Sequence, residues 1–393
     1  MVPRYGSSVV GGAETLCRLL ATNLAAHGTD VTVLTTCATD HFTWANALPP
    51  GASTHDGVTV RRFEVGPRDA RTFLALHTGI ALGPMPSYSE QLEWMANSVW
   101  APAMLAAVGD ECAYDWIVPL PYLFGTSFWA SAVRPKRTAM IPCLHDEPHA
   151  HTDVVLDCLS GVRGLMANTA TERDLMAMLL SRHRDGQSDN ALRAPVVSVG
   201  YHEEPPPTNA DVQAFCARQG IDPGYLLYAG RRESGKGVSE LFDLYREYRS
   251  RAANPRSLAL VGTGSLKTPK DLRPHVLDIG FLPDEDMSAA FAGASVLVHP
   301  SRLESLGMIM LEAWLAGTPA VVNGQSPVLV EHCRHGGGLW WQSPAEFCEA
   351  IELVTEDPAV AARLAEAGRE YVLTTYSWPA VRQRFLGALE DWS

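Results

Sequence analysis

Two glutamates stand eight positions apart in a segment that has the pattern of a strand followed by a helix. Glu304 and Glu312 flank Gly307, and the pair Pro300-Ser301 precedes them. On a single helix, eight residues would separate the carboxylates by about 80° around the axis and roughly 12 Å along it. They therefore cannot share a proton as a carboxylate dyad. The spacing suits two separated parts of one elongated ligand, with a helix N-terminus between them.

The predicted helix over 306–316 begins between these glutamates, where its free backbone N–H groups form a ready phosphate site. The residues at this helix start are Leu306, Gly307, Met308 and Ile309. Within the helix, Glu312 would accept hydrogen bonds from ribose hydroxyls, and Glu304 ahead of it would accept from a sugar. The alternative makes Glu304 a helix-entry carboxylate and Glu312 a solvated side chain. The apolar neighbours of Glu312 weigh against that, because an unpaired carboxylate among them is costly.

A second loop carries two cations. Gly230 opens the run Gly-Arg-Arg-Glu-Ser-Gly-Lys-Gly after a predicted strand over 225–229, and Arg231 and Lys236 stand five positions apart in it. A guanidinium fork and an ammonium at a strand's carboxyl end suit a diphosphate. The alternative is a solvated loop with ordinary surface charge. Lys236 is one of only four lysines in the chain, which favours the functional interpretation.

Two motifs in the first half of the chain also follow or precede regular elements. Gly12 belongs to a Gly-Gly turn that opens a predicted helix over 13–26, where a ligand would approach the backbone closely. His145 follows a predicted strand over 138–144, and two more histidines and two acids lie within the next six residues. Their spacing is not that of a helical metal site, and Pro148 interrupts regular structure. One functional histidine, His145, is favoured over a metal site, and no metal is predicted.

Composition narrows the class of protein. At 393 residues and 46% apolar, the chain is long enough for two globular domains. A net charge of −13 argues against nucleic acid as a partner. Eight scattered cysteines without a Cys-x-x-Cys pair suit a reducing compartment, and no apolar run reaches membrane-spanning length. We therefore expect a cytoplasmic protein without a membrane span, a signal peptide or a structural zinc site.

Strands alternate with helices along the whole chain, which predicts parallel sheets covered on both faces. The predicted strands span 30–36, 58–65, 115–120, 138–144, 164–168, 196–199, 225–229, 257–261, 276–279, 296–299 and 319–322. The predicted helices span 13–26, 90–107, 171–182, 238–251, 284–291, 306–316, 344–354 and 376–392. The proline-rich stretch 200–209 is the predicted linker between two doubly wound domains. Only residues 1–5 precede the glycine-rich stretch that begins at Gly6 and ends at Gly12, so we expect either a short first strand or further residues upstream that complete it.

Together these segments resemble family-4 retaining glycosyltransferases of the GT-B fold, over most of the chain. The family's Glu-x7-Glu motif is matched by Glu304 and Glu312, and its Gly-Arg…Lys-Gly loop is matched by residues 230–237. A Val-Gly-x-Gly turn falls at 261–264 with Gly262 in its centre. The segment 279–282 resembles the part whose backbone meets the nucleotide base, which implicates Phe281 and Leu282. The first half contributes the glycine loop with Gly12 and the strand-end His145.

The resemblance implies an α/β protein with two Rossmann-like doubly wound domains facing across a cleft. It implies an acceptor-binding domain over 1–200, braced by a C-terminal helix over 377–393, and a nucleotide-sugar-binding domain over 201–376. It further implies a retaining transfer of a hexosyl unit from a UDP- or GDP-linked sugar to a hydroxyl of a small molecule or glycan. Arg231, Lys236 and the helix start near Gly307 would stabilise the leaving phosphate without a metal.

The remaining implied roles concern the sugar and the acceptor. Glu304 would hold sugar hydroxyls, Glu312 the ribose, and His145 would orient sugar or acceptor. Two alternatives stay open: a sugar phosphorylase on the same architecture, and a catalytically silent sugar-nucleotide or glycan-binding protein. The donor sugar, the acceptor and the oligomeric state are not readable from these residues.

Overall fold

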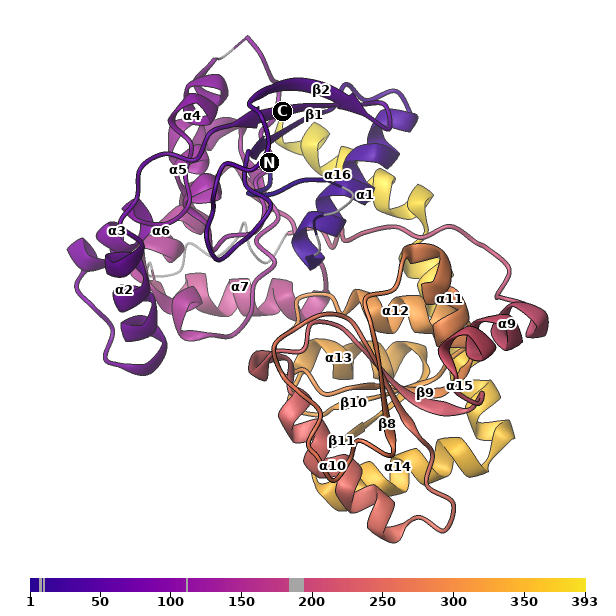
Figure 1. The fold of residues 1–393 in the computed structure, drawn as a ribbon. Helices are drawn as coiled ribbons and strands as arrows, with labels where there is room; N and C mark the ends of the chain where they lie inside the picture. Colours follow the sequence, from indigo (N-terminus) through magenta and orange to yellow (C-terminus); the bar gives the residue numbers. More distant parts are fainter. Residues whose placement is uncertain (7–8, 10, 111, 184–193) are drawn as a thin grey trace. The chain divides into compact units, whose positions relative to one another are not determined.

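The computed structural model describes residues 1–6, 9, 11–110, 112–183 and 194–393. The chain divides into two compact units (Figure 1). The first unit comprises Met1–Gly200 together with Trp378–Ser393, and the second comprises Tyr201–Ser377. None of the helices in the described part of the chain is both long and apolar enough to cross a membrane.

The first unit contains short strands and many helices. Its strands are β1 (Thr32–Thr36), β2 (Gly51–His55), β3 (Val58–Phe63), β4 (Ala139–Met140) and β5 (Gly164–Leu165). Its α-helices are α1 (Gly12–Ala26), α2 (Ala70–Leu82), α3 (Tyr88–Ala96), α4 (Pro102–Gly109), α5 (Gly125–Val133), α6 (Asp153–Gly161), α7 (Ala170–His183) and α16 (Trp378–Trp392). Two 3-10 turns, η1 (Pro135–Arg137) and η2 (Pro148–His151), lie before and after β4.

Strand β1 pairs in parallel with β3, and β4 pairs in parallel with β5. Backbone hydrogen bonds extend this array beyond the assigned strands. The Val2 amide donates to the Leu34 carbonyl at 3.2 Å, and the Leu120 amide donates to the Met1 carbonyl at 3.0 Å. Residues 1–3 therefore lie between β1 and the segment that ends at Leu120. The predicted strands at 115–120 and 196–199 appear only as isolated bridges at Ile117 and Val196.

Three features of the first unit differ from the sequence expectation. The strand β2 is antiparallel to β3, because the Asp-Gly turn at 56–57 closes a hairpin, so this sheet is not purely parallel. The predicted helix over 90–107 is two helices, α3 and α4, and Pro102 stands at the start of the second. The helices α2, α5 and α6 were not predicted at all.

The C-terminal helix α16, the yellow end of the chain in Figure 1, belongs to the first unit. The Arg382 side chain donates to the Asn23 side chain of α1 at 2.9 Å, and Arg163 donates to the Trp392 carbonyl at 2.9 Å. A Cβ on Gly164 would lie 2.5 Å from the Trp392 ring, so the indole packs directly on the backbone at β5. These contacts hold both ends of α16 in place.

The second unit contains one six-stranded parallel sheet in the order β11-β10-β9-β6-β7-β8. The strands are β6 (Tyr225–Ala229), β7 (Leu258–Val261), β8 (Val276–Gly280), β9 (Ala294–His299), β10 (Ala320–Asn323) and β11 (Gly338–Trp341). The helices are α9 (Asn209–Gln219), α10 (Val238–Arg251), α11 (Asp284–Ala292), α12 (Met308–Leu315), α13 (Pro327–His332), α14 (Pro344–Glu356) and α15 (Pro358–Thr375). A 3-10 turn η3 (Ser234–Lys236) precedes α10, and a π-helical turn η4 (Cys333–Gly337) follows α13.

Helices cover both faces of this sheet. On one face α10 and α14 bury Tyr245 and Phe347 against strand residues such as Leu226 and Val296, and all four are at most 2% exposed. On the other face, α11, α12 and α13 lie against β9 and β10. The strand order reverses between β6 and β9, which makes this the topological switch point of the sheet. Doubly wound folds bind ligands at such a point, outside the carboxyl ends of the strands.

Candidate functional site

The loops after β6 and β9 meet at the switch point of the second unit. Lys236, in the turn after β6, donates to the carboxylate of Glu304, after β9, at 2.7 Å. The two residues are 68 positions apart in the chain, so only the sheet order brings them together. Their side chains are 28% and 14% exposed, which leaves the pair close to solvent but largely shielded from it.

Lys236 determines the charge state of Glu304. Burial opposes the charge on this carboxylate, but Lys236 and the nearby His299 outweigh it and lower the Glu304 pKa to about 2. His299 ends β9, and its Nε2 lies 3.8 Å from the same carboxylate oxygen. Burial lowers the pKa of His299, so its ring is neutral near pH 7. Glu304 therefore presents a permanently ionised acceptor at the strand ends.

Close backbone packing holds the loop that carries Lys236. Gly237 has φ 73°, and a Cβ there would lie 2.4 Å from the Pro300 carbonyl oxygen, so only glycine lets the two loops approach this closely. Asn323 at the end of β10 donates to the same carbonyl at 3.1 Å. The loops after β6, β9 and β10 thus converge on Pro300.

The glycines at the ends of β6 and β7 are in direct contact. Gly262 has φ 116°, and a Cβ there would lie 2.1 Å from the Gly230 carbonyl oxygen. The Gly262 amide donates to Gly280 at the end of β8 at 2.7 Å. Beyond Gly280, Phe281 is 59% exposed and Leu282 is buried. The ends of β6, β7 and β8 thus present glycine backbone, and the exposed ring of Phe281 follows the last of them.

Arg231 lies between these glycines and Lys236. Its carbonyl accepts from the Tyr228 hydroxyl at 2.6 Å, which anchors the backbone. Its guanidinium is 40% exposed and makes one contact of 3.4 Å with Glu233. Arg231 and Lys236 are not in contact with each other in the structure. Four of the five N–H donors of Arg231 and two of the three of Lys236 have no protein acceptor among the described residues.

Helix α12 begins after Gly307, which caps it with φ 75° in the left-handed region. The predicted start at residue 306 was therefore two residues early, and Glu304 lies outside the helix. The amides of Met308 and Ile309 have no intrahelical acceptor, because they belong to the first turn. Leu306 is buried, and its carbonyl accepts from His332 Nε2 at 2.6 Å. The hydrogen bond from His332 thus holds the turn before α12 in place.

His332 was not predicted as a site residue. It is fully buried, and burial lowers its pKa to about 4, so the ring is neutral. A carbonyl only accepts, so Nε2 carries the proton, and Nδ1 accepts from the Tyr371 hydroxyl at 3.1 Å. A buried histidine at the end of α13 gave no periodic signal in the sequence. Its role is visible only from the carbonyl that it contacts.

Glu312 has the opposite environment from Glu304. It lies half-buried in α12, and no described side chain pairs with its carboxylate. Burial, with a smaller contribution from the like charge of Asp284, raises its pKa to about 7. The Tyr201 hydroxyl is also buried without a hydrogen-bond partner among the described residues, and its pKa is raised by burial and by Glu312. Glu312 is therefore a carboxylate without a partner among the residues that the structure describes.

The other two predicted site residues, His145 and Gly12, belong to the first unit. His145 Nδ1 lies 3.5 Å from Glu147, which also accepts from the Tyr122 hydroxyl at 2.8 Å. Despite burial, these contacts lower the pKa of Glu147, so a carboxylate orients the His145 ring. Gly12 begins α1 and is exposed. Among residues 1–6, 9, 11–110, 112–183 and 194–393, no three His, Cys, Asp or Glu side chains are grouped closely enough to hold a metal.

The comparisons with known proteins agree with this architecture. Residues 217–371, which lie within the second unit, match the family described as Glycosyl transferases group 1. The D-inositol 3-phosphate glycosyltransferase of Streptomyces scabiei (strain 87.22) is 28% identical over 416 residues, which cover 98% of this chain and 88% of the relative.

Two solved structures have the same fold. Sucrose-phosphate synthase (tll1590) from Thermosynechococcus elongatus superimposes with a TM-score of 0.71 at 18% identity, covering 99% of this chain and 98% of that one. Anabaena Alr3699/HepE in complex with UDP-glucose gives 0.66 at 18% identity, covering 99% of both chains. The expected α/β architecture of the GT-B class is therefore confirmed.

Proposed function

We propose that the protein is a retaining glycosyltransferase, which moves a hexosyl unit from a UDP- or GDP-linked sugar to a hydroxyl of a small-molecule or glycan acceptor. The observation that carries this proposal is the Lys236–Glu304 pair at the switch point, within a group 1 glycosyltransferase domain. A cation and an ionised acceptor stand side by side in this pair, and they would suit the phosphate and the hydroxyls of a nucleotide sugar. The UDP-glucose complex of the structural relative Alr3699/HepE supports the choice of donor class.

In the proposed reaction, the anomeric C–O bond of the donor breaks and negative charge builds on the departing diphosphate. The donors of Arg231 and Lys236 that lack protein acceptors, and the first amides of α12, would receive that charge. Glu304 would accept from sugar hydroxyls, and Glu312 would accept from the ribose. The backbone at Gly230, Gly262, Phe281 and Leu282 would border the nucleotide. Preorganised donors of this kind typically contribute about 10²–10³ each in rate.

The first unit would bind the acceptor, with Gly12 and His145 at its ligand-facing loops. The His145–Glu147–Tyr122 chain supports this role, because it fixes the ring of a solvent-accessible histidine. No metal is proposed, since the two cations and the helix N-terminus already oppose the phosphate charge. A new glycosidic bond with the configuration of the donor would identify the retaining course.

A donor panel tests the proposal. UDP- and GDP-sugars are incubated with the protein, with and without candidate acceptors, and nucleotide release and product anomeric configuration are measured. We expect one donor to release nucleotide in an acceptor-dependent manner, and Lys236→Ala to abolish most of it. Lys270→Ala, which removes an exposed lysine of the same unit, is the matched control.

Three results would contradict the proposal. Sugar release that requires inorganic phosphate would identify a phosphorylase. Donor binding without turnover across the panel would identify a binding protein. An inverted product would leave the transfer in place but exclude the retaining course.

A further inference from the structure

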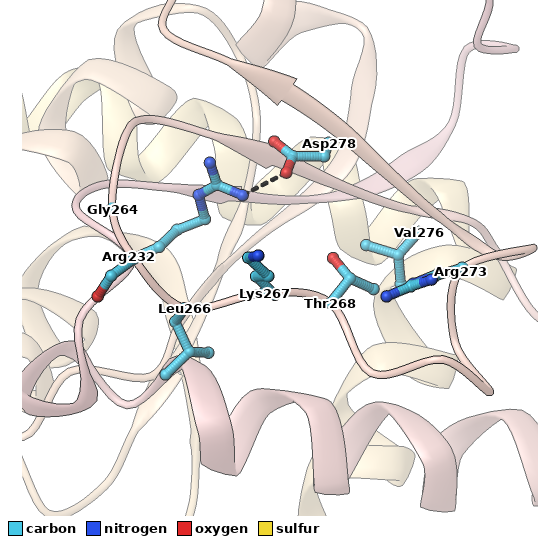
Figure 2. A pocket seen from close by; sticks show the side chains of 9 residues that line it. Arg232, Gly264, Leu266, Lys267, Thr268, Arg273, Val276 and Asp278 are labelled. Atoms are coloured by element: carbon cyan, nitrogen blue, oxygen red, sulfur yellow. Dashed lines mark hydrogen bonds and ion pairs between the residues drawn. The ribbon is translucent and has the colours of Figure 1, made fainter.

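A cavity of about 500 Å³ lies beside the edge strand β8 of the second unit, under the loop that connects β7 to β8 (Figure 2). Its wall includes Val276 and Asp278, which lie on the same face of β8. The loop residues Lys267, Thr268 and Arg273 also line it. Arg232 closes the wall from the loop after β6. This volume is within the range of small-molecule sites in proteins, roughly 300–1,000 Å³.

Most of the charged side chains around this cavity are cationic. Arg232, Lys267 and Arg273 line it together with one carboxylate, Asp278, so the formal charge of the lining is +2. The whole chain carries −13. No described residue forms an ion pair with Lys267 or Arg273, and both are exposed. Positive charge that Asp278 neutralises only in part, in an acidic protein, favours an anionic ligand.

Arg232 contributes the part of the site that is shielded from solvent. Its side chain is only 11% exposed, and it pairs with Asp278, as the dashed line in Figure 2 shows. Its Nε is buried with no hydrogen-bond partner among the described residues, and so is the hydroxyl of Thr268. Buried polar atoms without partners are costly. Both residues line the cavity, and a small rotation of either side chain would bring its donor to a ligand with acceptor oxygens.

We propose that this cavity binds the phosphate group of a small phosphorylated molecule. A phosphate monoester carries about −1.5 to −2 charges at pH 7 and three acceptor oxygens, which match the net charge and the unpaired donors of the lining. Guanidinium groups bind phosphate through paired hydrogen bonds, and two of the three cations are arginines. The volume leaves room for a group of monosaccharide size.

The cavity differs from the diphosphate site proposed above, because none of its lining residues belongs to the Lys236–Glu304 site. The two regions are connected through the backbone of Arg232. Its amide donates to the Thr263 carbonyl at 2.8 Å, and its carbonyl accepts from the Leu266 amide at 3.3 Å. The proposal therefore goes beyond the transferase activity and does not depend on it.

Binding of glucose 6-phosphate, inorganic phosphate and glucose, measured by isothermal titration at constant ionic strength, tests the proposal. We expect both phosphate compounds to bind, glucose not to bind, and a protein saturated with UDP still to bind glucose 6-phosphate. Lys267→Gln and Arg273→Gln should each weaken glucose 6-phosphate binding at least ~10-fold, since each removes a charged hydrogen-bond donor. Both side chains are exposed, so the fold should be unaffected, which a melting curve checks.

Lys270→Gln is the matched control, because Lys270 is an exposed lysine of the same loop that does not line the cavity. We expect it to leave binding unchanged. The proposal is wrong if neither phosphate compound binds, or if Lys270→Gln weakens binding as much as Lys267→Gln. It is also wrong if UDP displaces the phosphate compounds, because they would then occupy the diphosphate site.

Discussion

Glu312→Gln should stabilise the ligand-free protein at alkaline pH. Burial and Asp284 raise the Glu312 pKa from the ordinary 4.5 to about 7. The folded protein therefore binds this proton more tightly than the unfolded chain does, and the free energy of unfolding falls as the pH rises from 4.5 to 7. At about 1.4 kcal/mol per pKa unit, ionised Glu312 costs the folded state up to about 3 kcal/mol at pH 8. Glutamine has the same shape and no charge, so the variant should gain ~1–3 kcal/mol there.

Urea unfolding at pH 8 and pH 5 measures this effect. At pH 5 the wild-type Glu312 is already protonated in the folded state, so the gain should shrink to about 0.5 kcal/mol or less. Both units contribute to the unfolding curve, but wild type and variant differ at one residue only, so the difference in midpoint reports the effect of the substitution. A gain of equal size at both pH values would refute the assignment to ionisation.

Glu304→Gln provides a matched comparison with the opposite sign. Its pKa is lowered to about 2, so the stabilisation is fully present above pH 4.5 and is lost as the pH falls through 2. Removing this charge at pH 8 should cost ~1–3 kcal/mol, because Lys236 also loses its partner. Two substitutions of the same type, eight residues apart, should therefore shift the unfolding midpoint in opposite directions. Shifts in the same direction would show that the two environments are not as described.

Three further predictions concern ligands. Arg231→Ala and Lys236→Ala should each lower turnover at least ~10²-fold, and near-normal turnover in both would exclude them from the site. His332→Leu should raise the donor KM more than it lowers kcat, because the Leu306 carbonyl loses its hydrogen-bond donor and the turn before α12 loosens. Its control is Tyr245→Phe, which removes a buried hydroxyl elsewhere in the unit and should leave the donor KM unchanged. UDP affinity should rise as the pH approaches 7, because ribose hydroxyls donate to the ionised form of Glu312. Titration calorimetry in two buffers measures the accompanying proton release. A pH dependence of UDP affinity that persists in Glu312→Gln would contradict this prediction.

Most strands of the second unit were predictable from the sequence, whereas β11 and the helices α9, α13 and α15 were not predicted. Strands β6, β7, β9 and β10 lie within about one or two residues of their predicted bounds, because each is a short apolar run between turn residues. The first unit was less predictable. Beyond β1, β2 and β3, its pairing consists of the two-residue strands β4 and β5 and of isolated bridges, and these leave little periodic pattern. The helix over 90–107 was wrong because the apolar spacing continues across Pro102, which starts a new helix.

The site divides in the same way. Chain order alone identified Arg231, Lys236, Glu304 and Glu312 as candidates, since glycine turns and charged residues follow predicted strands. Their roles as ligand-binding residues stay predictions. The contact of Lys236 with Glu304, and that of His332 with Leu306, join residues 68 and 26 positions apart. Contacts between residues so far apart in the chain cannot be predicted from a local sequence pattern.

The amino-acid sequence is sufficient to predict the alternation of strands and helices, the positions of the glycine turns and the acidic character of the chain, because these depend on neighbouring residues and on composition. The tertiary structure decided which of the two glutamates is charged. Glu304 and Glu312 are chemically identical, but one lies against Lys236 and the other is half-buried without a partner. Desolvation and charge pairing depend on the packing of distant segments, so their balance emerges only when the sheet is assembled.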